Sequence, residues 1–390
     1  LFTVEVFETC KARLAPGGLV CAWFHSYGMS PRDFRMIVKT FHSVFPRATL
    51  WQSAYADYFL IGGEADLALD YARVAALLAD EKVKPVAREV LLEDPADLLS
   101  FLVLGPQGMA NYGQGGSWNT DDNAALEFSA PKNLYLPHLP LGLAPHFDLA
   151  WAEALLRNAP DSDEHRERMK VVLESRRRTL AGMEWVGSHP ATRLESELEA
   201  ALAGNPRNLI ASRFLSWHYL EEGNRLLRLG AQEADSERQK ARFEEAARQF
   251  EAAIQAHPQH ARAHSELGSA LFNMGRYDDA IPKYQDALAI NPEDAAAHLG
   301  LGACHFWKTR YDDAIEALTT AARLCPNYLK ARLFLAHAYT KSEKWREAAD
   351  AWREVLRLSP DDAEALERLT SAEQKVEATR REESHRAAQK

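Results

Sequence analysis

Features that are scarce in this sequence exclude several classes of protein. The four cysteines, Cys10, Cys21, Cys304 and Cys325, are scattered and form no C-x-x-C pair. They therefore predict neither a disulfide framework nor a zinc site, and we expect buried apolar thiols instead. The histidines fall at no metal-ligand spacing. We expect no metal and no cofactor in this chain.

Long apolar runs and an excess of basic residues are missing as well. No run approaches the roughly 18 apolar residues that a membrane span needs, and there is no signal peptide. The formal net charge of -10 argues against nucleic-acid binding, which requires a basic face. We therefore expect a cytoplasmic chain without a membrane segment. Its 390 residues exceed one core, so two or more folding units are predicted.

What the sequence does contain is a regular spacing of prolines. Pro258, Pro292, Pro326 and Pro360 follow one another at intervals of 34 residues. Proline suits the turn between helical hairpins because it cannot continue the preceding helix. Within each interval, small residues recur where two helices approach and large residues fill the gap to the next hairpin. In the interval from Pro258 to Pro292 these residues are Leu267, Gly268, Leu271, Ala280, Tyr284 and Ala287. This pattern resembles tetratricopeptide (TPR) repeats and predicts an all-α solenoid over residues 206–360.

The ends of the array depart from the regular period. Pro206 and Pro258 are 52 residues apart, which is 34 plus 18. The surplus at residues 226–240 is charged and helix-prone, so we expect it to lengthen two helices or their connection. Residues 161–205 predict a further TPR-like hairpin. Residues 363–380 predict a polar capping helix, and residues 381–390 a frayed tail.

Stacked first helices of TPR hairpins line a concave groove, and the register identifies its residues. The predicted peptide-binding positions form an aromatic strip edged with basic side chains: Arg213, Trp217, Leu220, Arg262, Ser269, Phe272, Asn273, Leu299, Phe306, Trp307, Lys330, Phe334, His337 and Lys341. Such a groove favours an extended or helical peptide with apolar anchors and some acidic character. Packing of each aromatic residue between repeats is the alternative. Some TPR domains clamp chaperone C-terminal tails with a set of Lys, Asn and Arg residues. This chain lacks that set, since Trp217 and Glu266 occupy two of the positions.

The first 131 residues alternate between helical and strand patterns. Residues 1–14 predict a helix, and residues 19–24 a strand buried on both faces. Ser30 and Pro31 predict the cap and first position of a second helix that ends before Pro46. Residues 49–53 and 58–61 predict a strand hairpin. This order is typical of the last part of a doubly wound α/β sheet with an antiparallel edge.

Three segments of this region resemble a known family. The runs LAPGGLVCAWFHSYGMSPRDFRMIVKTFHSVFP, TLWQSAYADYFLIGG and NTDDNAALEFSAP are similar to the C-terminal half of spermidine synthase-like proteins, the polyamine aminopropyltransferases with a Rossmann-like fold of the class I methyltransferase type. The likeness is to a bacterial branch in which the synthase domain can follow a membrane-spanning region or precede TPRs. The chain starts at Leu1, within a predicted helix, so we expect it to be part of a longer protein, as the cytoplasmic portion of a membrane-anchored parent would be.

The resemblance implies transfer of an aminopropyl group from decarboxylated S-adenosylmethionine to a diamine. That reaction needs a glycine-rich turn, acidic residues and a proton-accepting Asp. In the family these lie on earlier strands, so catalytic residues are predicted to be absent here. Tyr55 matches a substrate-binding tyrosine of the family, with a surface aromatic as the alternative. Ala22 and Trp23 stand where the family often has a glutamine. Residues 119–122 match a family segment that an Asx-type turn also explains.

Together these patterns divide the chain into five parts. We predict an α/β domain at 1–131, a linker at 132–160, a hairpin at 161–205, TPR repeats at 206–360, and a capping helix with tail at 361–390. The predicted function is a protein-interaction scaffold attached to a truncated synthase-like domain. The alternative is an aminopropyltransferase whose catalytic half lies upstream of residue 1.

Overall fold

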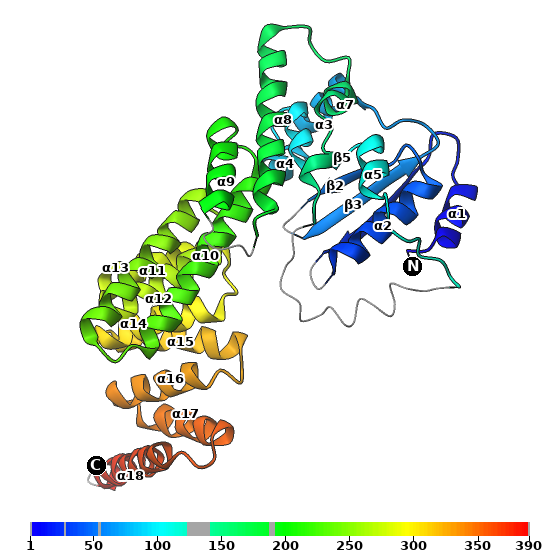
Figure 1. The fold of residues 1–390 in the computed structure, drawn as a ribbon. Coiled ribbons are helices and arrows are strands. Elements are labelled where there is room, and N and C mark those ends of the chain that lie inside the picture. Colours follow the sequence, from blue (N-terminus) through cyan, green and yellow to red (C-terminus); the bar gives the residue numbers. More distant parts are fainter. Residues whose placement is uncertain (1, 27–28, 54–55, 123–140, 187–191, 389–390) are drawn as a thin grey trace. The chain divides into compact units, whose positions relative to one another are not determined.

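The computed structural model describes residues 2–26, 29–53, 56–122, 141–186 and 192–388 (Figure 1). The chain divides into two compact units, Leu1–Leu215 and Ser216–Lys390. The first combines a small sheet with helices, and the second is helical. Each unit is described by itself below.

The first unit is built around a four-stranded sheet. Its strands are β1 (Leu19–His25), β2 (Thr49–Gln52), β3 (Asp57–Gly63) and β5 (Leu102–Leu104), in the order β1-β3-β2-β5. Each neighbouring pair is antiparallel. Because β1 and β2 are both antiparallel to β3, they run in the same direction. The predicted strands are confirmed, but β3 lies inside the described sheet and not at its edge.

One face of the sheet is covered by α2 (Pro31–Val44), which starts as predicted. Ser30 caps the helix by accepting a hydrogen bond from the Asp33 backbone N–H at 3.1 Å, and Pro31 is the first residue. The helix buries Phe34 and Phe41 completely, and Phe34 meets the strand residue Tyr58 edge to face at 4.9 Å between ring centroids. The core of the sheet therefore lies between β1–β3 and α2. α1 (Val4–Ala12) packs against α2.

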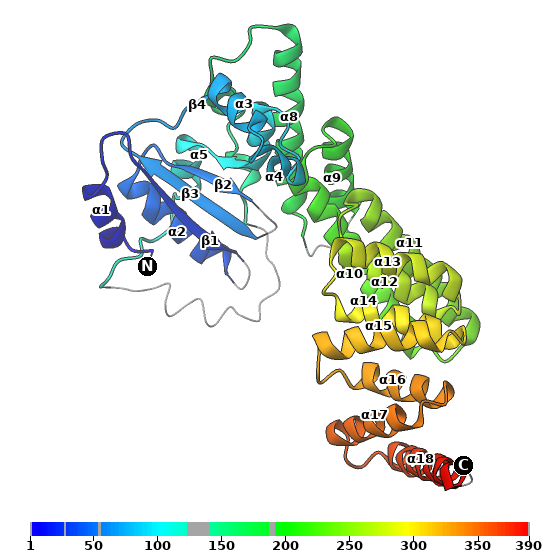
Figure 2. The same ribbon diagram turned by 180° about the vertical axis from the view of Figure 1, so that it is seen from behind.

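The other face of β1 is open, which corrects the prediction of a strand buried on both faces. Leu19 and Trp23 are each 52% exposed, and Cys21 between them is exposed too. These three side chains alternate along β1 and share one face. Figure 2 shows this side of the sheet, where β1 and β3 have no helix in front of them. The apolar run predicts burial, yet Leu19, Cys21 and Trp23 are exposed and Phe24 is the one strand residue that is buried.

The rest of the first unit is a set of short elements followed by two long helices. Their bounds are β4 (Leu69–Asp70), α3 (Tyr71–Ala79), α4 (Lys84–Glu89), η1 (Pro95–Phe101), α5 (Pro106–Tyr112), η3 (Ala144–His146), α7 (Leu149–Leu155), β6 (Leu156–Arg157), α8 (Asp163–Met183) and α9 (Thr192–Gly204). The segment predicted as a linker thus contains η3, α7 and β6. The predicted hairpin corresponds to α8 and α9, which belong to the same compact unit as the sheet. The domain boundaries themselves stay predictions.

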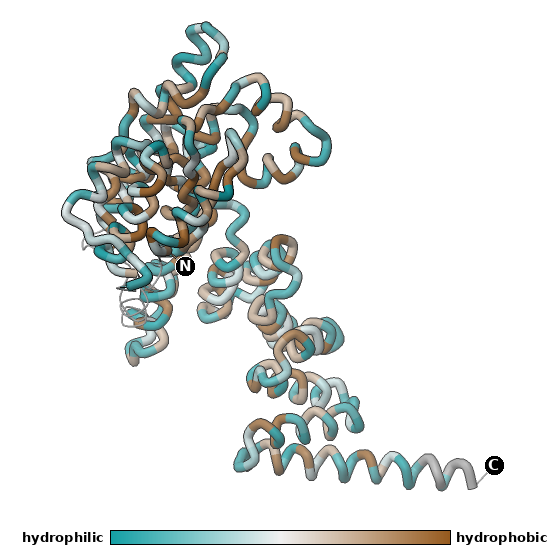
Figure 3. The backbone as a smooth tube through the Cα atoms, turned by 90° about the vertical axis from the view of Figure 1, so that its right-hand side faces the viewer, coloured by the Kyte–Doolittle hydropathy of each residue, from teal (hydrophilic) through white to brown (hydrophobic). Residues whose placement is uncertain are grey.

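The second unit stacks helices in antiparallel pairs. They are α10 (Leu209–Gln232, which begins in the first unit), α11 (Ser236–Ala256), α12 (Ala261–Asn273), α13 (Tyr277–Ile290), α14 (Ala295–Trp307), α15 (Tyr311–Leu324), α16 (Leu329–Lys341), α17 (Trp345–Leu358) and α18 (Ala363–Ala388). The 18 surplus residues lengthen α10 and α11, as one of the two predicted possibilities. Figure 3 shows hydrophilic residues predominating on α18, as expected of a capping helix. The tail predicted to fray is helical as far as Ala388.

Side chains at equivalent repeat positions stabilise the turns between hairpins. His264, His298 and Arg332 each lie six residues after a turn proline. Each bonds through a side-chain nitrogen to that proline's carbonyl oxygen, at 2.9, 3.0 and 2.8 Å. Because proline ends the preceding helix, its carbonyl has no helical partner and the next helix supplies one. This bond repeats with the 34-residue period.

Tyr284 on α13 fixes how closely neighbouring hairpins approach. A β-carbon built on Gly268 would lie 2.9 Å from the Tyr284 ring, and one built on Gly300 would overlap the ring from the next hairpin. The ring therefore fills a gap between two glycines. Any side chain at Gly300 must displace Tyr284 or separate α12–α13 from α14.

We predict that Gly300→Ala destabilises the solenoid. Overpacking of this kind costs about 1–3 kcal/mol, and urea denaturation followed by circular dichroism measures it. Gly204→Ala is the matched control, because nothing lies within 4 Å of a β-carbon there, and alanine favours the helix. Equal stability of Gly300→Ala and the wild type would show that the hairpins are not held this closely.

Candidate functional site

Aromatic rings form a continuous row across the repeats, from α12 to α17. Phe272 on α12 lies 5.3 Å from Tyr277, between ring centroids, and Tyr277 stacks on Trp307 at 6.4 Å with 7° between the planes. Trp307 then meets its neighbour Phe306 at 5.9 Å. These contacts join α12 and α13 to the end of α14.

The row continues into the next hairpin. Phe306 contacts Phe334 at 5.7 Å and His337 at 6.4 Å, and His337 meets Trp352 edge to face at 4.8 Å. We call the set Phe272, Tyr277, Phe306, Trp307, Phe334, His337 and Trp352 the aromatic row. Six of its members are on the surface to some extent, and Trp352 is fully buried.

Exposure separates the members of the aromatic row by role. Trp307 is 55% exposed, whereas Phe272, Phe306, Phe334 and His337 are half-buried. The half-buried rings pack between hairpins and also present part of their surface. Packing between repeats is therefore observed for these rings, and their contact with a peptide stays a prediction. Large aromatic surfaces with partial exposure are typical of sites that anchor a partner's side chains.

Basic residues accompany the row on α16. Lys330, Phe334, His337 and Lys341 are spaced at four, three and four residues, which places them on one side of the helix. Both lysines are exposed, and neither forms an ion pair within the part of the chain that the structure describes. Other lysines of the repeats do: Lys308 Nζ lies 2.6 Å from Asp278, and Lys344 Nζ lies 2.7 Å from Asp312.

Other predicted groove residues have different surroundings. Arg262 is exposed and lies 3.6 Å from Glu266, whose carboxyl pKa is raised chiefly by burial. Asn273 is exposed and Trp217 half-buried. Leu220 and Leu299 are 2% and 9% exposed. They belong to the core and cannot be contact residues, which corrects their assignment.

Three further predicted site residues, Ser269, Arg213 and Tyr55, are not part of the aromatic row. Ser269 accepts a hydrogen bond from the Tyr284 hydroxyl at 3.2 Å, so it ties α12 to α13. Arg213 belongs to the first unit, where burial lowers its pKa, and is not described together with the repeats. Tyr55 lies outside the described residues, and so do residues 123–131 of the third family-like segment.

Burial of two histidines predicts acid sensitivity of the repeats. Burial lowers the pKa of His337 and of His305. Around His337, Lys341 and Arg368 lower the pKa further, while Glu364 and Asp362 oppose them. The unfolded chain, with a histidine pKa of about 6.5, therefore takes up protons that the native state does not bind.

We accordingly predict that stability is complete above about pH 6.5 and falls as the pH drops below it. Urea midpoints of the wild type and of His337→Gln, taken at about pH 7.5 and about pH 5.5, test this. The variant should show a smaller drop between the two. A wild-type midpoint that rises on acidification would contradict the prediction.

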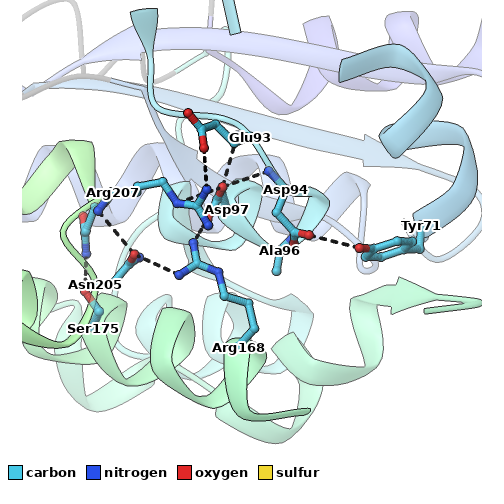
Figure 4. Close-up of polar contacts among 10 residues, drawn as sticks. Tyr71, Glu93, Asp94, Ala96, Asp97, Arg168, Ser175, Asn205 and Arg207 are labelled. Atoms are coloured by element: carbon cyan, nitrogen blue, oxygen red, sulfur yellow. Dashed lines mark hydrogen bonds and ion pairs between the residues drawn. The ribbon is translucent and has the colours of Figure 1, made fainter. Parts of the chain in front are cut away.

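A cluster of charged side chains lies in the first unit, and no sequence pattern predicts it. Asp97 on η1 is 1% exposed and accepts bonds from the backbone N–H groups of Glu93 and Asp94, at 3.1 and 2.9 Å (Figure 4). Arg168 of α8 donates to its other oxygen. Arg207 approaches Asp97 at 3.6 Å and pairs with Glu93 at 2.9 Å.

This cluster borders a cavity of about 470 Å³ lined by Tyr71, Asp94, Pro160, Ser162, Glu164, His165, Arg168 and Arg207. The two guanidinium groups already face Asp97 and Glu93, and the Tyr71 hydroxyl donates to Asp94 at 3.0 Å. Each of the two guanidinium groups is therefore paired with a carboxylate of the protein. The arrangement is that of a structural junction between η1, α8 and the start of α10.

Arg176 forms a second link between α8 and the sheet. It is completely buried, and it donates to the Leu102 carbonyl at 2.6 Å and to Gln52 Oε1 at 3.0 Å. Burial lowers the pKa of Arg176 to about 9. A buried charge needs such partners because desolvation is costly. These bonds explain why α8 is grouped with the sheet and not with the repeats.

Some kinds of site were not found in the described ranges. No cluster of three or more His, Cys, Asp or Glu side chains there is placed to hold a metal ion. The helices described also include none with the length and apolar character needed to cross a membrane. The four cysteines are free thiols, and of these Cys304 is buried while Cys21 and Cys325 are exposed. The prediction that all four cysteines are buried was therefore wrong.

Comparison with known protein families agrees with the repeat geometry. One tetratricopeptide repeat family matches residues 232–290 and 266–328, and another matches residues 308–372. No curated protein matches the chain at a significant level.

Solved structures to which this chain is similar include the following three, two of which are described as TPR proteins. MamA is 22% identical, with 41% of this chain and 82% of that chain covered and a TM-score of 0.36. YrrB, described as a TPR protein with an unusual peptide-binding site, is 24% identical, with 44% and 83% covered and a TM-score of 0.33. The first TPR of Spaghetti (RPAP3), bound to an HSP90 peptide, is 26% identical, with 30% and 96% covered and a TM-score of 0.29.

The family matches follow the 34-residue period of the prolines and the helix pairs from α11 to α18. The C-terminal region of this chain is therefore an array of tetratricopeptide repeats.

Proposed function

We propose that the chain acts as a protein-interaction scaffold whose repeats bind a peptide segment of a partner protein. The observation that carries this proposal is the aromatic row, which spans three hairpins and includes the exposed Trp307. Apolar surface of this kind, bordered by charged side chains, marks sites where a partner docks. A solenoid presents such a surface as a rigid face, so a partner can bind without refolding it.

The proposal predicts that a partner contacts the repeats at Trp307. A photo-crosslinking amino acid in place of Trp307 should yield a covalent adduct with a defined partner peptide in a lysate of the source organism. The same amino acid at Lys240, exposed on α11, is the matched control. The additional substitution Phe306→Ala should reduce the yield of the adduct formed at position 307. Equal adducts from both positions, unaffected by Phe306→Ala, would place the binding surface elsewhere.

A second candidate function is the alternative taken from the family resemblance. We propose that the first unit is the C-terminal part of a spermidine synthase-like domain that is catalytic only when completed. The observation that favours it is the outer edge of β1, with which none of the described strands pairs. Ser26 N–H donates to Ala56 at 2.7 Å, so even-numbered β1 residues pair with β3, while the backbone groups of Cys21 and Trp23 point to the opposite edge.

No strand among the described residues pairs with that edge. Phe7 of α1 contacts Phe41 of α2 at 4.8 Å, so both helices cover the same face. A right-handed crossover through α1 would bring a preceding strand to the free edge of β1. The apolar side chains of Leu19 and Trp23 would then be covered by helices of the added part, as in doubly wound sheets.

This candidate is tested by calorimetry with decarboxylated S-adenosylmethionine. The present chain should neither bind it nor transfer an aminopropyl group, whereas a longer protein with the glycine-rich turn and the proton-accepting Asp should do both. Binding by the present chain at micromolar affinity would overturn the assignment of the active site to an upstream part. We also propose a cytoplasmic location, which the four free thiols support, since reducing compartments keep thiols unpaired.

A further inference from the structure

We propose that the partner segment is an extended acidic peptide with one aromatic or large aliphatic anchor, bound between Lys330 and Lys341. This inference rests on the proposed scaffold function and specifies the ligand of the same surface.

The distribution of charge between the two helices of each hairpin carries the argument. The first helices α12, α14 and α16 hold four basic residues, Arg262, Lys330, Arg332 and Lys341, and one acidic residue, Glu266. The second helices α13, α15 and α17 hold nine acidic and five basic residues. A chain with a net charge of -10 thus keeps its first-helix side basic, which is complementary to an acidic ligand.

Among the basic residues of the first helices α12, α14 and α16, Lys330 and Lys341 are the two that form no ion pair with the described residues. Arg262 pairs with Glu266 at 3.6 Å, and Arg332 with Glu354 at 3.5 Å. Lys330 and Lys341 have no carboxylate partner within the described ranges. Lys308 and Lys344, which lie at the turns, instead bind the first-turn aspartates of the preceding second helices, Asp278 and Asp312.

The rings between the two lysines supply the anchor site. Phe334 and His337 lie between Lys330 and Lys341 in the sequence of α16, and both rings contact Phe306 of α14. Each of these three rings is half-buried. An apolar side chain of the ligand that packs on them would bury the surface they still expose, which is the main source of affinity at such sites.

The separation of the lysines distinguishes an extended from a helical ligand. Eleven residues of α-helix separate them by about 16 Å along the axis. An extended chain covers that distance in about five residues. Carboxylates two or three positions to either side of the anchor would therefore reach both lysines, whereas a helical ligand would need them about eleven positions apart.

Fluorescence anisotropy with the full chain tests the proposal. The probe is a labelled peptide with the sequence Glu-Glu-Ser-Trp-Ser-Glu-Glu. Two further peptides replace every glutamate by lysine, or the tryptophan by alanine. The protein variants are Lys330→Glu/Lys341→Glu and, as a control of equal charge change, Lys240→Glu/Lys283→Glu on α11 and α13. Circular dichroism verifies that each variant folds.

The acidic peptide should bind the wild type and the control pair equally, and bind Lys330→Glu/Lys341→Glu at least about tenfold more weakly. The lysine peptide should bind Lys330→Glu/Lys341→Glu more tightly than it binds the wild type. Binding of the acidic peptide to the wild type should weaken as the salt concentration rises. The alanine peptide should lose affinity for all three proteins.

Two results would overturn the proposal, and they differ in what they leave standing. If the lysine peptide binds the wild type as tightly as the acidic one, and Phe306→Ala weakens both, the scaffold function stands but the acidic ligand is wrong. If no peptide binds and no partner crosslinks at Trp307, the scaffold function fails as well. A crosslinked partner whose contacting segment carries no acidic residues would also contradict the acidic ligand.

Discussion

Replacing Trp352 by alanine is expected to unfold the C-terminal end of the solenoid under mild conditions. Its ring is completely buried among the alanines of α16, α17 and α18, and the indole N–H donates to Thr340 at 3.0 Å. Removing a buried tryptophan leaves a cavity, at a cost of about 3–5 kcal/mol. The Thr340 hydroxyl loses the indole donor but keeps its own bond to the Ala336 carbonyl at 2.8 Å. Repeat proteins are stabilised by contacts between neighbours, so the loss should stay local.

Hydrogen exchange can locate this effect within the repeats. Amides of α16 to α18 should exchange faster in Trp352→Ala, and amides of α12 and α13 should change little. Trp307→Ala is the matched control, since the same substitution is made in a side chain that is 55% exposed. The control should keep wild-type exchange throughout. Equal destabilisation by both substitutions would mean that Trp307 is as structural as Trp352.

Replacing Asp97 by alanine should have a comparable effect on the first unit. The substitution removes the acceptor for the Glu93 and Asp94 backbone N–H groups and leaves Arg168 and Arg207 without their shared carboxylate. Loss of one partner from a buried ionic cluster costs about 3 kcal/mol or more. For Asp97→Ala we expect a loss of stability of about 3 kcal/mol. The side chains of Arg168 and Arg207 are 23% and 32% exposed, so solvent replaces part of the lost interaction.

The matching experiment is urea denaturation of Asp97→Ala beside Asp163→Ala. Asp163 also pairs with an arginine, Arg166, at 2.6 Å, but its side chain is 99% exposed. Exposed pairs of this kind contribute little, so Asp163→Ala should keep the wild-type midpoint. An unchanged midpoint for Asp97→Ala would show that the cluster does not hold η1 to α8.

The repeats could be predicted from the sequence because their determinants are local and periodic. Proline at every 34th position, Gly268 beside Tyr284 and alanines at the helix contacts each act within one or two hairpins. The same holds for the Ser30 cap of α2, which depends on residues three positions apart. The register predicted the members of the aromatic row on the first helices, but not Tyr277 and Trp352 on the second helices. It also did not distinguish Leu220 and Leu299, which are core, from the half-buried rings.

The junction in the first unit could not be predicted because it joins residues that are distant in sequence. Asp97 and Arg168 are 71 positions apart, and Arg176 lies 124 positions from Gln52. No spacing rule relates such residues, and runs of charge such as residues 161–168 look the same whether one arginine is solvated or bound. The open face of β1 was missed for a related reason, since an apolar run does not reveal which of its alternate residues is covered.

The most direct test of the central claim is hydrogen exchange of the full chain with and without its crosslinked partner peptide. We predict protection on α12, α14 and α16, centred on Phe306, Trp307 and Phe334, with no change on α13 and α15. Protection confined to the second helices, or to the first unit, would contradict the claim that the first-helix face of the repeats is the binding surface.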